Sequence, residues 1–89
     1  MNATSKSANE LKDDLKLYET FERSWKETLK QDLLSYELIE KSDILPGSSK
    51  QAALKVMRNK LKRDRWNITR AQNLTLKVKK EIHEHSHCQ

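Results

Sequence analysis

Residues 54–82, LKVMRNKLKRDRWNITRAQNLTLKVKKEI, decide the fold of this 89-residue chain. Their mostly apolar or small seam residues recur in alternating steps of three and four. This spacing is a heptad repeat, in which two positions of every seven face one seam of a helix. We expect one long helix over about residues 49–83, with Ser48 and Gln51 as its capping box. Its seam positions are Leu54, Met57, Leu61, Asp64, Ile68, Ala71, Thr75, Val78, Ile82 and His85.

The first half of the chain carries a second amphipathic pattern. Its apolar side chains also fall three or four residues apart and share one side of a helical wheel. Ser7 and Glu10 fit a capping box at the start, so a helix over about residues 8–41 is predicted. The apolar positions are Leu11, Leu15, Tyr18, Phe21, Trp25, Leu29, Leu33, Tyr36 and Ile39.

A turn over residues 42–48 separates the two predicted helices. It holds the single proline and the single glycine of the chain, Pro46 and Gly47, which suit a type II turn with a positive φ at the glycine. The predicted fold is therefore an all-α antiparallel hairpin of two long, coiled-coil-like helices. If the second helix breaks near residues 66–69, the alternative is a three-helix bundle or a histone-fold-like arrangement, because Thr69 and Gln72 offer another cap there.

Charge favours the same hairpin. Residues 1–49 carry 7 Lys/Arg and 10 Asp/Glu, whereas residues 50–89 carry 11 Lys/Arg and 3 Asp/Glu. An acidic helix beside a basic one is preferred over pairing of like helices. We expect residues 1–7 and 84–89 to form a disordered N-terminus and a frayed tail around a hairpin over residues 8–83. The predicted packing seam consists of Trp25, Leu29, Leu33, Tyr36, Leu61, Ile68, Val78 and Ile82.

No catalytic or cofactor motif emerges from the sequence. One glycine cannot build a glycine-rich phosphate loop. Residues 83–87, HEHSH, match the HExxH zinc pattern, but only Cys88 and Gln89 follow, so a third zinc ligand and a substrate cleft are lacking. We expect a protein that is not an enzyme and that uses no metal or cofactor.

Cysteine content and hydropathy bear on the compartment. The single cysteine, Cys88, allows no internal disulfide, and the first ten residues contain no apolar core of a signal peptide. No segment has the roughly 20 apolar residues of a spanning helix, so we expect no membrane insertion. An intracellular protein is predicted, nuclear rather than cytoplasmic because residues 58–65 resemble a basic import signal.

The leading functional prediction is a small subunit that packs with other helical protein subunits in a larger complex, as a scaffold or adaptor. Three apolar side chains outside the seam, Leu34, Leu38 and Trp66, form the predicted partner surface. The alternative is a nucleic-acid-binding module on the basic second helix, since cations beside an aromatic residue can hold phosphates and stack on a base. Its candidate contacts are Arg58, Lys60, Lys62, Arg63 and Arg65. Self-association into a four-helix homodimer is a third hypothesis.

Overall fold

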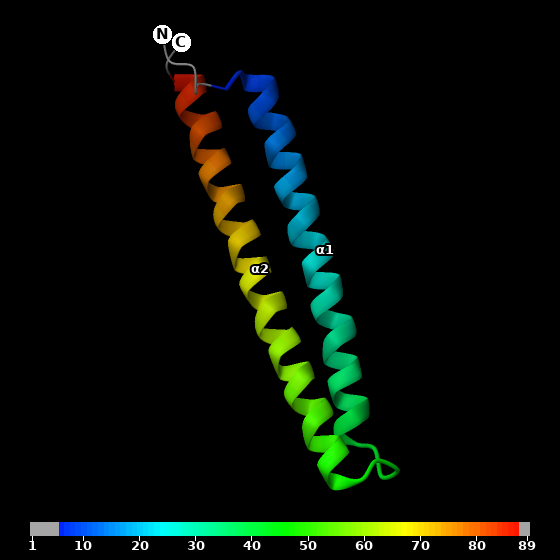
Figure 1. Ribbon diagram of the computed structural model, residues 1–89. Helices are drawn as coiled ribbons and strands as arrows, with labels where there is room; N and C mark the ends of the chain where they lie inside the picture. Colours follow the sequence, from blue (N-terminus) through cyan, green and yellow to red (C-terminus); the bar gives the residue numbers. More distant parts are fainter. Residues whose placement is uncertain (1–5, 88–89) are drawn as a thin grey trace.

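The computed structural model describes residues 6–87, which form two long helices packed side by side (Figure 1). Helix α1 spans Ala8–Glu40 and helix α2 spans Gly47–His87. The chain reverses between them, so the start of α1 and the end of α2 lie at the same end of the molecule. The radius of gyration is 19.6 Å, against about 12 Å for a compact domain of this length. The predicted antiparallel helical hairpin is confirmed.

Helix α1 begins and ends with local hydrogen bonds. The extended residue Ser7 is the N-cap, and its Oγ accepts a hydrogen bond from the amide of Glu10 at 3.2 Å. At the other end the amide of Lys41 donates to the carbonyl of Glu37 at 3.0 Å, while the two side chains form an ion pair. These bonds satisfy backbone groups that would otherwise lack partners at the helix termini.

The connection between the helices differs from the predicted type II turn. Gly47 does not have a positive φ and is the first residue of α2. The amide of Lys50 donates to the carbonyl of Pro46 at 2.8 Å, the first bond of the helical ladder. Proline has a fixed φ and no backbone N–H. It therefore suits the start of a helix, where the backbone N–H groups have no acceptor within the helix. Helix α2 thus starts two residues earlier than predicted, and Ser48 lies inside its first turn instead of capping it.

Replacing Gly47 with alanine is expected to raise the free energy of unfolding by about 0.4–1 kcal/mol. Beyond its chain neighbours and its own helix backbone, a Cβ at this position meets no atom within 4 Å, and alanine restricts the unfolded chain while fitting the helix. Urea denaturation followed by circular dichroism measures the change. The reverse substitution at an exposed position of the same helix, Ala52→Gly, is the control and should lower stability by about 1 kcal/mol. A loss of stability in Gly47→Ala would show that the glycine needs the positive φ of a turn.

Helix α2 runs without interruption through residues 66–69, which rules out the three-helix and histone-fold-like alternatives. Asn67 and Thr69 are modest helix formers, but burial of Ile68 and Ala71 in the seam outweighs their weak intrinsic preference. The helix also continues to His87, so residues 84–87 are helical where a frayed tail was expected. Residues 1–5 and 88–89, including Cys88, lie outside the described part of the chain.

The core is a single seam between the helices. The buried side chains of α2 all occupy predicted heptad positions, from Leu54 near the turn to Val78. Ile82 is partly buried, and His85 is exposed near the level at which α1 begins. The buried residues of α2 are Leu54, Met57, Leu61, Asp64, Ile68, Ala71, Thr75 and Val78.

Helix α1 contributes larger side chains that are only partly enclosed. Leu11 is buried, whereas Trp25, Leu29 and Tyr36 are half-buried because bulky groups extend beyond a two-helix seam. Leu33 is 42% exposed, and its assignment to the seam is corrected. Leu33 follows Asp32 by one residue, which places it on a flanking position of the heptad frame of α1. The seam positions of that frame are Leu15, Tyr18, Glu22, Trp25, Leu29, Asp32, Tyr36 and Ile39.

Candidate protein-binding groove

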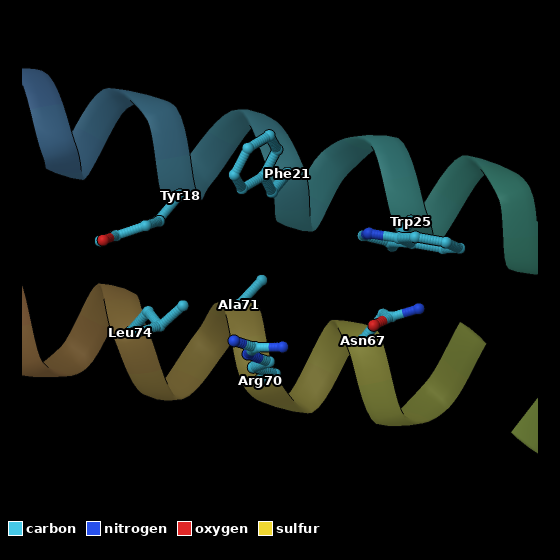
Figure 2. Close-up of a pocket in the computed structure, with 7 residues that line it drawn as sticks. All are labelled: Tyr18, Phe21, Trp25, Asn67, Arg70, Ala71 and Leu74. Atoms are coloured by element: carbon cyan, nitrogen blue, oxygen red, sulfur yellow. The ribbon is translucent and has the colours of Figure 1, made fainter. Parts of the chain in front are cut away.

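Aromatic and aliphatic side chains from both helices line a pocket along one side of the seam (Figure 2). Tyr18, Phe21 and Trp25 come from α1, and Tyr18 and Trp25 point toward α2. The lining residues of α2 are Asn67, Arg70, Ala71 and Leu74. The large Trp25 of α1 and the small Ala71 of α2 thus line the same pocket. Phe21 is 46% exposed, so the pocket leaves an aromatic ring accessible.

Two further pockets adjoin this one. The first shares Arg70 and Leu74 with it and adds Trp66 and Lys77. The second shares Tyr18 and Leu74 with the aromatic pocket and extends toward Asp14 and Glu81. We call the combined depression the seam groove, defined by Tyr18, Phe21, Trp25, Trp66, Arg70, Leu74 and Lys77.

The α2 wall of the seam groove is cationic. The Arg70 guanidinium lies 5.4 Å from the ring centroid of Trp66, a cation–π contact that leaves its charge uncompensated. Within residues 6–87, no carboxylate lies within ion-pair distance of Arg70 or Lys77. At the far end Lys6 pairs with Asp14, and the hydrogen bond to that carboxylate raises the pKa of Lys6.

A buried charge cluster lies next to the groove in the middle of the hairpin. Asp64 is fully buried, and its Oδ1 accepts from Nη2 of Arg63 at 3.2 Å. Nη2 of Arg63 also lies 3.8 Å from Oδ2 of Asp32 in α1, and the guanidinium is 5.5 Å from the ring centroid of Trp25. Burial raises the pKa of the Asp64 carboxyl, and the neighbouring Asp32 raises it further, while Arg63 opposes both effects.

Another polar seam residue, Glu22, is held as a carboxylate. Its Oε2 pairs with Lys26 Nζ at 2.7 Å. The hydrogen bond to Lys26 lowers the pKa of Glu22 against the effect of burial, and Gln72 of α2 lowers it as well. Across the seam, the ion pair of Arg63 with Asp32 connects the two helices and helps to fix their register.

The predicted partner surface is exposed but divided between the helices. Leu34 and Leu38 lie one turn apart on α1, with exposures of 48% and 74%. Trp66, on α2, is 61% exposed and belongs to the seam groove. Only Trp66 of the three lines the groove, and a partner role for this set stays a prediction.

The basic run divides between two sides of α2. Arg58, Lys62 and Arg65 occupy heptad positions on the side opposite the seam groove, where cations of α1 also point. Lys60 is exposed on the groove side, while Arg63 is engaged by Asp64, Asp32 and Trp25. The five candidate nucleic-acid contacts thus do not share one face, and Arg63 has an internal structural role.

Exposed cations of both helices lie on the side opposite the seam groove. We define this basic face by Lys12, Lys16, Arg23, Lys26, Lys30, Lys55, Arg58, Lys62, Arg65 and Lys79.

Sequence reasoning missed Arg70, Leu74 and Lys77. In an antiparallel coiled coil, flanking positions on the same side of both seams face each other. Phe21 and Leu74 are such a pair, and they line one pocket. Combining the heptad frame of each helix with the antiparallel direction would have found this pairing.

Within the described residues, no group of three or more His, Cys, Asp or Glu side chains is placed to hold a metal ion. The HExxH pattern, residues 83–87, forms the last residues of α2. Neither helix, over the residues that the structure describes, has a segment long and apolar enough to cross a membrane. Comparisons with protein-family models, curated proteins and solved structures found no match to this chain.

Proposed function

We propose that this chain is a non-enzymatic helical subunit that packs against partner helices in a larger intracellular, nuclear complex. The observation that carries the proposal is the seam groove, where aromatic side chains of a two-helix core remain accessible. The accessible surface is 7068 Å², compared with about 5,400 Å² for a compact protein of this mass. A difference of this size is about twice the area that each partner buries in a standard protein interface, about 800 Å².

The nuclear part of the proposal rests on the basic run at residues 58–65, whose composition resembles that of import signals. The scaffold role rests on shape. A long hairpin has one seam filled by its own side chains, and a third helix laid along the groove would complete a bundle.

The basic face supports nucleic-acid binding as a second candidate function. Arg58, Lys62 and Arg65 have no carboxylate within ion-pair distance among the described residues. Exposed cations from both helices on one side provide the charge that phosphates require. This candidate differs from the sequence-based one, because it uses cations of α1 and excludes Arg63.

One co-purification experiment from the native cell separates the two candidates. The double variant Leu17→Ser, Phe21→Ser removes apolar surface on the groove side, where both residues are about half exposed. We expect it to lose the protein partner, since truncating central aromatic contacts weakens binding about tenfold or more. The triple variant Arg58→Glu, Lys62→Glu, Arg65→Glu should retain that partner.

Circular dichroism of both variants is the folding control, and it should show the helicity of the unaltered chain. Loss of bound nucleic acid in the triple variant, with a steep dependence of wild-type binding on salt, would support the second candidate instead. A wild-type chain that purifies alone would contradict both proposals.

A further inference from the structure

The seam groove has the direction and length of a helix-binding site. It follows the interface of α1 and α2, from Asp14 and Glu81 at one end to Asn67 at the other. The α2 residues along it span about 20 Å, which corresponds to roughly four helical turns. A helix packed there would lie against both helices at once, as the third member of a bundle does.

The two walls of the groove differ in chemistry. The α1 side presents Leu17 and Phe21, followed by the uncharged residues Ser24 and Thr28. The α2 side presents Arg70 and Lys77, seven residues and therefore about 10 Å apart. Arg63, a further seven residues toward the turn, has its guanidinium committed to the buried carboxylates. Two uncompensated cations thus border one edge of an apolar strip.

From this arrangement, and given the helical-subunit function proposed above, we infer that the seam groove binds an acidic amphipathic helix of a partner protein. Its apolar stripe would cover Phe21, Trp25 and Leu74, and carboxylates along one edge would lie beside Arg70 and Lys77. Charge complementarity supports this occupant, since Arg70 and Lys77 border the groove without an ion-pair partner among the described residues, whereas the one unpaired carboxylate lining it, Glu81, lies at its far end. A partner helix with glutamates seven residues apart matches the cation spacing.

Other occupants fit the groove less well. A second copy docked groove to groove would bring two rows of the same cations together, which costs binding energy. A nucleic acid would meet a wall of α1 without cations, whereas the opposite side of the hairpin offers the basic face. The exposed rings of Phe21 and Trp66 favour a protein stripe, because aromatic residues concentrate at the centre of protein interfaces.

The test is a display selection on the immobilised full-length chain, using a library of helical peptides about four turns long. Apolar stripe positions are kept, and the flanking positions are randomised. We expect the selected peptides to be enriched in Asp and Glu along one edge. Their affinity should fall about tenfold or more on the variant Arg70→Glu, Lys77→Glu. Exchanging the acidic residues of a selected peptide for lysine should restore binding to that variant.

The matched control is the variant Lys55→Glu, Lys62→Glu, which makes the same change in charge on the basic face. It should bind the selected peptides as the unaltered chain does.

Selected helices without acidic enrichment, or binding that survives Arg70→Glu, Lys77→Glu, would overturn the inference and leave the subunit function intact. No selected helix, together with no partner in co-purification, would overturn both. A wild-type dimer in sedimentation that Phe21→Ser dissociates would assign the groove to a second copy. Duplex or single-stranded DNA released by the Arg70 and Lys77 reversals would assign it to nucleic acid, and either result would overturn the inference.

Discussion

Leu61→Ala is expected to lower the free energy of unfolding by about 2–5 kcal/mol. Leu61 is 6% exposed and lies in the middle of the α2 seam. The hairpin has no second layer of helices to collapse into the cavity that alanine would leave. Since small domains are stable by only about 5–15 kcal/mol, the variant should unfold at much lower urea concentration and temperature. Circular dichroism at the helical minimum follows both transitions.

Leu38→Ala is the matched control, because it removes the same atoms from a side chain that is 74% exposed. Its effect should stay within about 0.5 kcal/mol. Equal losses in the two variants would show that burial in the seam is not what stabilises the hairpin.

The seam of α2 could be predicted from sequence because its pattern is simple. Steps of three and four continue from Leu54 to Val78 without proline or glycine, and each predicted position in that range is buried. The pattern of α1 is less regular. Its stripe mixes seam residues with flanking ones such as Phe21 and Leu33, which lie too far around the helix to be enclosed by a single partner.

The turn could not be decided from local sequence. Pro46 and Gly47 suit a type II turn and suit the start of a helix, and the two arrangements differ by little in local energy. In the fold the helix begins at Gly47, two residues earlier than predicted, and its first backbone bond runs from the Lys50 amide to the Pro46 carbonyl.

The functional surfaces depend on the orientation of side chains that look alike in sequence. Arg58, Arg63 and Arg65 are the same type of residue, but only Arg63 lies within ion-pair distance of Asp32 and Asp64. Likewise Leu74 belongs to a binding surface only because Phe21 of the other helix lines the same pocket. The heptad frame gives positions around one helix, whereas a binding groove requires the alignment of two.

Asp64→Leu is expected to stabilise the hairpin by about 1 kcal/mol at neutral pH, the low end of the range for replacing a whole buried ion pair, because Asp32 and Arg63 remain as a pair. Asp64 is fully buried, and its Oδ2, like Oδ2 of Asp32, has no hydrogen-bond donor within the described residues. Ionised, the two carboxyls repel each other in a poorly solvated seam that a single Arg63 neutralises only in part. Leucine would fill this seam position with apolar volume. Asp13→Leu, the same change at an exposed position of α1, is the control and should alter stability by no more than about 0.5 kcal/mol.

The pH dependence of stability distinguishes this cause from simple packing. Because the folded-state pKa of Asp64 is raised, the stability due to its protonated form is fully present below the unfolded-state value of about 3.9. That contribution is lost as the pH rises through the folded-state pKa. The unfolding free energy of Asp64→Asn, which cannot ionise, should therefore exceed that of the unaltered chain by an amount that grows from acidic to neutral pH. Urea titrations of both chains across this range measure the difference. A constant difference would mean that the carboxyl does not titrate in the fold, and a less stable Asp64→Leu would mean that Arg63 compensates the buried charge fully.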